Sequence, residues 1–223
     1  EALELGPWRR DEYVLALSEG ERKLSEKRRA AWSRSNQLIV GLNTGCSPVI
    51  PYKKLTVERH REIAQALIEK GYAVVLVGGP EDGLRNERIG YGLDVIQSPT
   101  AGGLRDGIAS LAACDIVVTG DSLGMHLAIA LKKWTVAWFG PTCDHEIDLY
   151  DRGVYVKTEA ACSPCWKRSC DKPTMCYDLV STQALLEGVS LGARSQTNQV
   201  LQNERNEKLA CQNFSKATAD PRT

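Results

Sequence analysis

Clusters of glycines and small polar or charged residues follow four apolar segments of the sequence, at the point where each segment ends. The clusters are 43–47, 78–82, 119–126 and 140–142, and the basic pair Lys53-Lys54 lies shortly after the first. Glycine lets a ligand approach the backbone closely, and free N–H groups at the start of a helix bind phosphate oxygens. Together the four clusters supply the groups that a nucleoside diphosphate sugar needs.

Individual side chains in these clusters have separate roles available to them. Lys53 can place a positive charge beside the phosphates, and the amides of 122–126, at the start of a helix, can face a pyrophosphate. A carboxylate such as Glu81 can accept hydrogen bonds from both hydroxyls of a ribose. Asp121 can do the same for the sugar being transferred.

Each of these features also has an ordinary structural explanation. Asp121-Ser122 is a good helix N-cap with or without a ligand, and Gly78-Gly79-Pro80 alone indicates only a turn. His126 lies on an apolar helix, where it can be a hydrogen-bonded core residue, and single charges such as Lys53 and Glu81 are usually solvated. A binding site is favoured because the four clusters converge on one edge of one predicted sheet.

Motifs of two common nucleotide-binding classes are missing. The chain has neither a G-x-x-x-x-G-K-[ST] phosphate loop nor an early G-x-G-x-x-G fingerprint, so kinase-like and dehydrogenase functions are disfavoured. The 28 basic and 28 acidic residues balance to a formal net charge of +0. Nothing in this charge distribution indicates a general nucleic-acid binder.

Four cysteines lie close together, and they are Cys162, Cys165, Cys170 and Cys176. The C-x-x-C spacing of the first pair suits one edge of a tetrahedral zinc site with a structural role, which the other two could complete. An iron–sulfur cluster, one or two disulfides, and unliganded loop thiols are the alternatives. A zinc ribbon that binds nucleic acid is disfavoured, because a second C-x-x-C pair is lacking.

The elements that position these residues alternate along the chain. Apolar, β-branched segments at 38–42, 73–77, 93–96, 115–119 and 135–139 are typical of buried strands. Segments 56–70, 104–113 and 122–131 have the apolar spacing of helices, and Gly71 ends the first of them. Strands that alternate with helices imply right-handed crossovers. The sequence therefore predicts a doubly wound α/β fold, with a parallel, Rossmann-like sheet covered by helices on both faces.

The two ends of the chain differ from this central part. Residues 1–36 are charged and helical in character and are interpreted as an interdomain linker or packing helix. Residues 37–189 form the predicted binding domain, with the cysteine-rich loop 162–176 and a short helix at 181–189, and residues 190–223 form a polar helix or tail. The longest apolar runs are too short to span a bilayer. The scattered Cys46, Cys114 and Cys143 favour reduced thiols in a cytosolic protein.

Several segments resemble one protein family. The stretch 115–131, which contains Asp121-Ser-Leu-Gly-Met-His126, followed by Thr135–Thr142, resembles glycosyltransferase family 9. This is the lipopolysaccharide heptosyltransferase family, which has a two-domain GT-B fold. The segments 74–82 and 41–45 also match in order and spacing, and a cysteine-rich segment occurs at this point in many members. The resemblance covers about residues 37 to 189 and implies the C-terminal, donor-binding half of such an enzyme.

Two departures from the family pattern stand near the implied site. Leu123 occupies the position where the family has a glycine directly after Asp-Ser, and Gly124 comes one place later. Leu55-Thr56 stands where many relatives have Trp-Pro.

The resemblance implies that Lys53 contacts the phosphates, Glu81 the ribose and Asp121 the transferred sugar, while the backbone of 122–126 holds the pyrophosphate. The donor is then an ADP-sugar, with heptose as the sugar and lipid-A–core as the acceptor. The expected donor-binding residues are Thr44, Lys53, Glu81, Asp121, Ser122, Leu123, Gly124, Met125 and His126.

The implied reaction is an inverting displacement at the anomeric carbon by an acceptor hydroxyl that a carboxylate deprotonates. In the family the N-terminal domain binds the acceptor and supplies this base, and nothing before Gln37 could form that domain. The chain alone is therefore expected to be inactive. Transfer is expected to need no metal, because Lys53 and helix amides can offset the charge on the departing diphosphate. The expected location is the cytoplasm, with peripheral association at the inner face of the inner membrane.

Two alternatives to a heptosyltransferase-like function remain open at this point. One is a non-catalytic nucleotide-binding or regulatory module that keeps the fold without transferring sugar. The other is a GT-B enzyme that uses a different nucleotide sugar, including a sugar-nucleotide epimerase. The residues alone do not identify the donor sugar.

Overall fold

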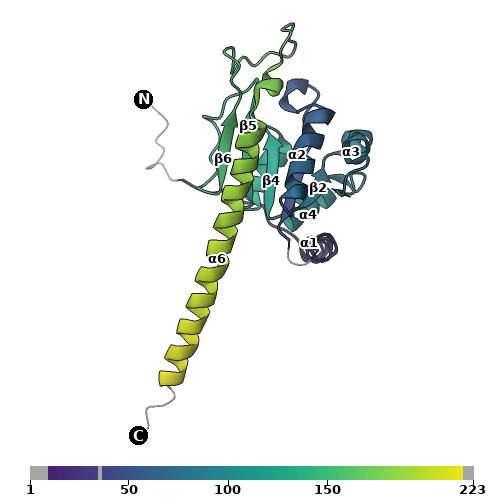
Figure 1. The fold of residues 1–223 in the computed structure, drawn as a ribbon. Coiled ribbons are helices and arrows are strands. Elements are labelled where there is room, and N and C mark those ends of the chain that lie inside the picture. Colours follow the sequence, from purple (N-terminus) through teal and green to yellow (C-terminus); the bar gives the residue numbers. More distant parts are fainter. Residues whose placement is uncertain (1–9, 35–36, 218–223) are drawn as a thin grey trace, which may run out of the picture.

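A computed structural model describes residues 10–34 and 37–217, and Figure 1 shows their arrangement. Within these residues, six strands form one sheet in the order β3-β2-β1-β4-β5-β6, and every neighbouring pair is parallel. This is the strand order of doubly wound dinucleotide-binding folds, with the order reversing between β1 and β4. The strands are β1 (Ile39–Asn43), β2 (Ala73–Val77), β3 (Ile96–Gln97), β4 (Ile116–Gly120), β5 (Trp134–Phe139) and β6 (Gly153–Lys157).

Helices cover both faces of this sheet. They are α1 (Glu19–Trp32), α2 (Val57–Glu69), α3 (Gly83–Gly90), α4 (Gly103–Ala113), α5 (Leu123–Ala130) and α6 (Thr182–Ala217), with 3₁₀ helices η1 (Pro51–Lys53), η2 (Pro80–Asp82) and η3 (Cys176–Leu179). One core layer joins α2, α3 and α6 to the sheet, and α1, α4 and α5 pack on the opposite face. The predicted doubly wound α/β fold is therefore confirmed.

The predicted helix over 56–70 shows how closely the local sequence determines an element. Thr56 caps α2 by accepting a hydrogen bond from the Arg59 N–H at 3.1 Å. Ile63 and Leu67 lie on the face that is buried against the sheet. Gly71, with φ of +85°, ends the helix in a left-handed conformation that favours glycine.

Two strands differ from the prediction. β6 lies at the sheet edge, and its residues alternate in exposure, with Val156 buried and Tyr155 and Lys157 exposed. An edge strand needs no continuous apolar run, so the sequence of β6 lacks the pattern that predicts a buried strand. β3 is at Ile96–Gln97, later and shorter than the predicted 93–96, because only these two residues pair with β2.

The segment before the sheet forms a helix packed on α4. Ser18 and Glu21 make a capping box at the start of α1. At the other end of α1, the buried Arg28 donates to the Asp106 carboxylate at 2.8 Å and to the Asp106 carbonyl oxygen at 2.7 Å. Trp32 lies in the core layer beneath the sheet.

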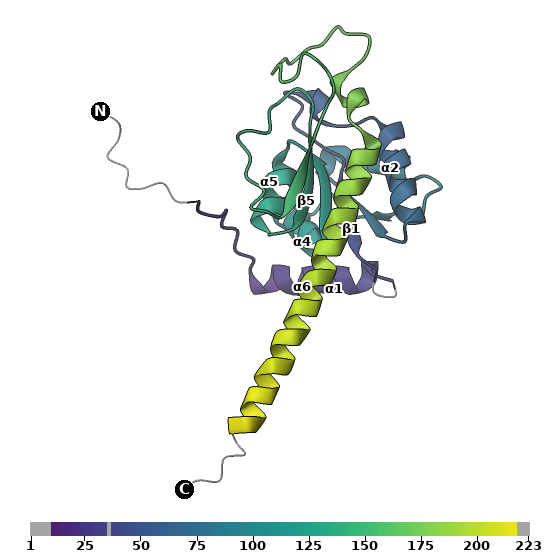
Figure 2. The same cartoon turned by 60° about the vertical axis from the view of Figure 1, so that its left-hand side comes forward.

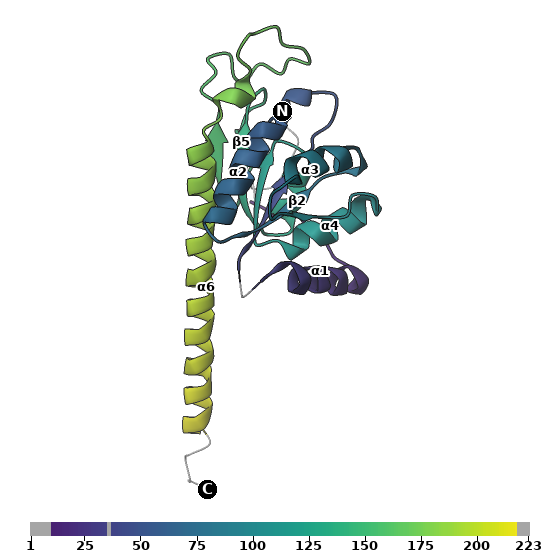
Figure 3. The ribbon, with the colours of Figure 1, turned by 45° about the vertical axis from the view of Figure 1, so that its right-hand side comes forward.

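One continuous helix, α6, includes both the short predicted helix at 181–189 and residues 190–217 of the predicted polar helix or tail; the rest of that predicted segment, 218–223, lies outside the described residues. Its first turns bury Leu185, Leu186 and Val189 against the sheet. The ribbon of these turns lies beside α2 (Figure 3). Beyond these turns α6 extends away from the domain (Figure 2). Among the described residues, none of the helices has the length and apolar character needed to cross a membrane.

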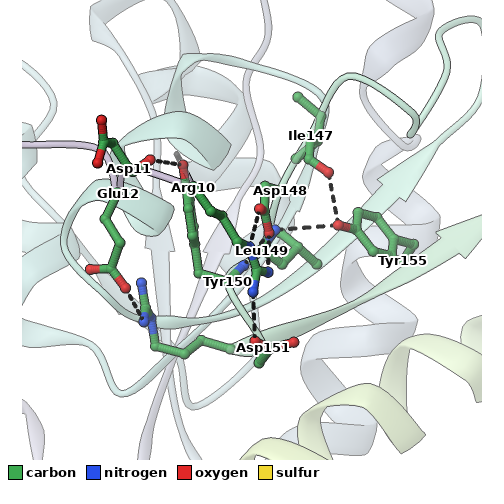
Figure 4. A network of polar contacts seen from close by, with 10 residues as sticks. Arg10, Asp11, Glu12, Ile147, Asp148, Leu149, Tyr150, Asp151 and Tyr155 are labelled. Atoms are coloured by element: carbon green, nitrogen blue, oxygen red, sulfur yellow. Dashed lines mark hydrogen bonds and ion pairs between the residues drawn. The ribbon is translucent and has the colours of Figure 1, made fainter. Parts of the chain in front are cut away.

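The stretch 10–18 begins against the connection between β5 and β6, which Arg10, Asp11 and Glu12 contact (Figure 4). Arg10 contacts Asp148 at 2.6 Å and Asp151 at 3.0 Å, and Glu12 accepts from Arg152 at 2.9 Å. The Tyr150 hydroxyl donates to the Asp11 carbonyl oxygen at 2.9 Å. These exposed ion pairs contribute little stability individually, so the network mainly sets the path of the chain.

Candidate functional site

A cavity of about 620 Å³ lies at the carboxyl ends of the strands. Its walls are the loops after β1, β2, β3 and β4, together with the first turns of α4 and α5. This edge is where ligands bind in open parallel sheets. The sequence-predicted residues that line it are Lys53, Glu81, Asp121, Ser122, Leu123, Gly124 and His126.

Asn43, the last residue of β1, connects two walls of this cavity. Its side-chain amide donates to the Thr119 hydroxyl at 2.9 Å and to the Ser122 hydroxyl at 2.8 Å. A Cβ added at Gly124 would lie 2.7 Å from the Asn43 side chain. Gly124 therefore supplies the close approach between Asn43 and α5 in a chain that carries Leu123 directly after Asp121-Ser122.

Lys53 and Asp121 form an ion pair inside the cavity. The Lys53 Nζ lies 3.2 Å from Asp121 Oδ2, and the two side chains are 17% and 15% exposed. Gly120 permits this pairing, because any side chain there would overlap the Lys53 carbonyl oxygen. The structure thus brings together Lys53, the residue expected to contact the phosphates, and Asp121, the residue expected to contact the sugar.

The start of α5 faces the same cavity. Ser122 precedes the helix with extended backbone, but its side chain makes no capping bond to α5 and instead accepts from Asn43. The first N–H groups of the helix belong to Leu123 and Gly124, which both line the cavity. A helix start of this kind carries partial positive charge that favours an anion.

The loop after β2 uses its two carboxylates differently. Asp82 is buried, accepts from the Gly79 N–H at 2.9 Å and lies against Gly45, where a Cβ would overlap its carboxylate. Burial raises the pKa of the Asp82 carboxyl above its ordinary value. Both residues line the cavity, but only Glu81, on η2, is exposed, so its carboxylate is the more accessible of the two.

Two of the expected donor-binding residues are not brought to the cavity. Thr44 is fully buried, and its hydroxyl contacts Asn86 Oδ1 at 2.5 Å. Met125 is also fully buried, in a core cluster with Phe139. Neither side chain is among those that line the cavity, because both point into packed parts of the domain.

His126 lines the cavity and is partly exposed, so it is not a core histidine. Its ring lies 6.2 Å from the ring of Tyr13, measured between centroids. Tyr13 belongs to the stretch 10–18, so this N-terminal part of the chain reaches the rim of the cavity.

Sequence reasoning missed the part of the wall that follows β3. Ser98, Pro99, Thr100 and the start of α4 line the cavity, and the Ser98 hydroxyl donates to the Ser110 hydroxyl at 2.6 Å. The same rule that identified the other loops would have found these residues, because they follow the carboxyl end of a strand. The predicted strand at 93–96 ended too early to draw attention to them.

The half-buried guanidinium of Arg85 lies behind the wall of the cavity. Arg85 donates to the carbonyl oxygens of Thr44 and Leu55, and its guanidinium lies 3.3 Å from His60 Nδ1. Burial, followed by the charge of Arg85, lowers the pKa of His60 to about 4. His60 is therefore neutral at pH 7, and it does not line the cavity.

The four clustered cysteines line a second, smaller cavity of about 130 Å³, together with Tyr52 and Lys172. Cys162, Cys165, Cys170 and Cys176 are free thiols. Within the described ranges, no group of three or more His, Cys, Asp or Glu side chains is arranged to hold a metal ion. A structural zinc at these thiols therefore stays a prediction.

The sheet and the cavity define a Rossmann-like α/β domain in which the start of α5 faces a cavity at the carboxyl ends of the strands. A model of glycosyltransferase family 9 (heptosyltransferase) matches residues 9–175, and the chain belongs to this family. The chain is 32% identical over 135 residues to lipopolysaccharide heptosyltransferase 2 of Salmonella typhimurium, a match that covers 57% of this chain and 38% of that protein.

Solved structures share the fold. ADP-heptose LPS heptosyltransferase II of E. coli matches with a TM-score of 0.66 and 24% identity, over 82% of this chain and 54% of that one. The E. coli heptosyltransferase WaaC, solved with ADP, matches with a TM-score of 0.53 and 20% identity, over 72% of this chain and 46% of that one. The chain thus spans about half the length of these structures and a smaller share of its curated relative.

Proposed function

We propose that this domain binds the nucleotide-sugar donor of a heptosyltransferase that acts on lipopolysaccharide core, with ADP-heptose as the donor. Membership of glycosyltransferase family 9 supports a glycosyl transfer. The relatives that match are lipopolysaccharide and lipooligosaccharide heptosyltransferases, and one structural neighbour was solved with ADP. The cavity at the strand ends offers the space and the charge for such a donor.

The observation that carries this proposal is the placement of Lys53 and Asp121 beside the start of α5. A cation and free helix amides bind a diphosphate, and a carboxylate 3.2 Å from the cation can accept hydroxyls of the attached sugar. The diphosphate–sugar junction is then at this pair, and the ribose extends toward Glu81. The nucleobase lies along the wall after β3, which Ser98 and Pro99 begin.

In this proposal the transfer is an inverting displacement. An acceptor hydroxyl attacks the anomeric carbon, its proton passes to a carboxylate, and the nucleoside diphosphate leaves with the electron pair of the broken bond. Lys53 and the α5 amides stabilise the charge that develops on the leaving diphosphate, so this step requires no metal.

A separate acceptor domain supplies the base and orients the lipid-A–core acceptor in this scheme, because the chain spans only about half of its structural relatives. The proposal places the protein in the cytoplasm, at the inner face of the inner membrane. Thiols such as Cys46, Cys114 and Cys143 stay reduced in the cytoplasm, and all three are free.

Calorimetry on the 223-residue chain tests donor binding directly. ADP should bind, and UDP and GDP should bind more weakly or not at all. Absence of heat with all three nucleotides, on a sample shown to be folded by circular dichroism, would overturn the donor-site proposal. Binding of UDP or GDP in preference to ADP would instead assign a different nucleotide sugar.

Transfer itself is tested by donor consumption with a lipid-A–core acceptor. The chain alone should show none, and the chain joined to an acceptor domain should be active, since domain closure supplies base and positioning. Turnover by the chain alone would place the base among Asp121, Glu81 and His126. Nucleotide binding with no turnover in either form would indicate a non-catalytic module.

A further inference from the structure

Tyr52 and Lys53 are consecutive residues of η1, but they line different cavities. Lys53 lines the large cavity at the strand ends, and Tyr52 lines the small cavity of the four cysteines. The 3₁₀ helix η1 is therefore a wall that the two cavities share. Because one peptide unit joins the two residues, a shift of Tyr52 also shifts the backbone of Lys53.

The cysteine-rich loop (162–176) holds η1 from the Tyr52 side. The Cys170 N–H donates to the Tyr52 hydroxyl at 3.2 Å, across 118 residues of sequence. The loop is itself attached to the end of β5, because the N–H groups of Cys165 and Trp166 both donate to the Pro141 carbonyl oxygen, at 3.0 and 2.8 Å. Ser163 adds a hydrogen bond to the Gly140 carbonyl oxygen at 2.5 Å.

The other side of η1 rests on the ends of β4 and β5. Gly120 leaves no space beside the Lys53 carbonyl oxygen, and the Trp138 ring lies against both Gly120 and Gly140. Among the described residues, one hydrogen bond joins η1 to the second half of the cysteine-rich loop. It is the bond from the Cys170 N–H to the Tyr52 hydroxyl.

We propose that Tyr52 is a positioning residue for diphosphate binding. Its hydroxyl, held by Cys170, orients η1 so that the Lys53 ammonium stays beside Asp121 in the donor cavity. The inference rests on the proposed function, because the position of Lys53 is measured through the affinity of the chain for a diphosphate. It makes the cysteine-rich loop part of the donor site, although no cysteine lines the donor cavity from that loop.

The test compares ADP with adenosine, which lacks the phosphates, in the wild-type chain and in Tyr52→Phe. Loss of one neutral hydrogen bond should weaken ADP binding about 3- to 10-fold. Adenosine affinity should stay within about 2-fold, because Glu81 and the wall after β3 do not depend on η1. Tyr177→Phe is the matched control, since it removes a hydroxyl near the same loop without touching the contact to Cys170.

A second measurement keeps the inference separate from a general loss of structure. If Tyr52 acts through Lys53, Tyr52→Phe should have no further effect on ADP affinity in a Lys53→Ala background. Equal losses of ADP and adenosine affinity, or unchanged ADP affinity in Tyr52→Phe, would overturn the role of Tyr52 and leave the donor site in place. Failure of the folded wild-type chain to bind ADP would overturn the proposed function instead.

Discussion

The ammonium of Lys53 lies 3.2 Å from a carboxylate oxygen of Asp121, although 68 residues separate the two in sequence. Both side chains are mostly buried in the wall of the cavity at the carboxyl ends of the strands. A diphosphate that enters this cavity must therefore share Lys53 with a carboxylate that is already its partner. Under the proposed function, the balance between these two anions sets the affinity for the nucleotide and for the intact donor.

Substitutions at the two members of this pair should separate their roles. Lys53→Ala should weaken ADP binding by about 1.5–3 kcal/mol, the usual contribution of a hydrogen bond to a charged group. Asp121→Asn should leave ADP affinity unchanged or higher, because Lys53 loses its competing anion, while the affinity for ADP-heptose falls. Calorimetry with both ligands measures the difference.

The control for this pair is Lys54→Ala, which removes the neighbouring charge outside the cavity and should leave both affinities unchanged. Loss of ADP binding in a folded Asp121→Asn variant would show that Asp121 contacts the nucleotide rather than the sugar.

Glu81→Gln should weaken adenosine and ADP by the same factor, because the proposed contact is to the ribose that both share. Loss of a charge-assisted bond predicts about 1.5–3 kcal/mol for each ligand. Glu87→Gln, on the exposed side of α3, is the matched control. An effect of Glu81→Gln on ADP alone would contradict the ribose assignment.

Gly124→Ala should lower both stability and ADP affinity. The added Cβ would lie 2.7 Å from the Asn43 side chain, and Asn43 joins the loops after β1 and β4. Overpacking of this kind costs about 1–3 kcal/mol of unfolding free energy. Chemical denaturation measures it, and Gly20→Ala is the control because a Cβ there meets no atom within 4 Å. Equal stability of the two variants would show that Asn43 can move without cost.

Stability should fall as the pH drops from about 6.5 to 5, because of His60. Its pKa is lowered to about 4 in the folded chain by burial and by Arg85, whereas the unfolded chain takes up a proton near pH 6.5. In this window the unfolded state binds more protons, so the free energy of unfolding decreases with falling pH, and by pH 4 the total loss approaches about 3 kcal/mol.

His60→Gln should remove most of this pH dependence between 6.5 and 5, while His145→Gln, which changes an exposed histidine, should retain it. Urea denaturation at a series of pH values makes the comparison. A slope that is unchanged in His60→Gln would assign the dependence to another group.

Elemental analysis of chain purified under reducing conditions tests the predicted zinc. Four thiolates are enough ligands for one structural ion, and the four thiols line one small cavity. About one zinc per chain is expected, and Cys170→Ser should reduce it. Neither zinc nor iron at a stoichiometric level would leave unliganded loop thiols as the description of this segment.

The sequence by itself determined the layout of the domain. Apolar segments such as 73–77 and 135–139 form strands of the sheet. Thr56 and Gly71 mark the two ends of α2. These signals could be recognised because each acts over only a few residues. β6 was missed because an edge strand buries only one face, and the length of α6 was missed because a polar helix continues beyond its packed turns.

The edge of the sheet that carries the candidate site was also determined by the sequence, since parallel strands place all their carboxyl ends together. Which side chains face the cavity was decided only by tertiary packing. Thr44 and Met125 stand beside cavity residues in the sequence, yet Thr44 turns to Asn86 and Met125 to the core around Phe139. The pairing of Lys53 with Asp121 was also decided by tertiary packing. It requires η1 to pack against the end of β4, where Gly120 has no side chain that would overlap the Lys53 carbonyl oxygen.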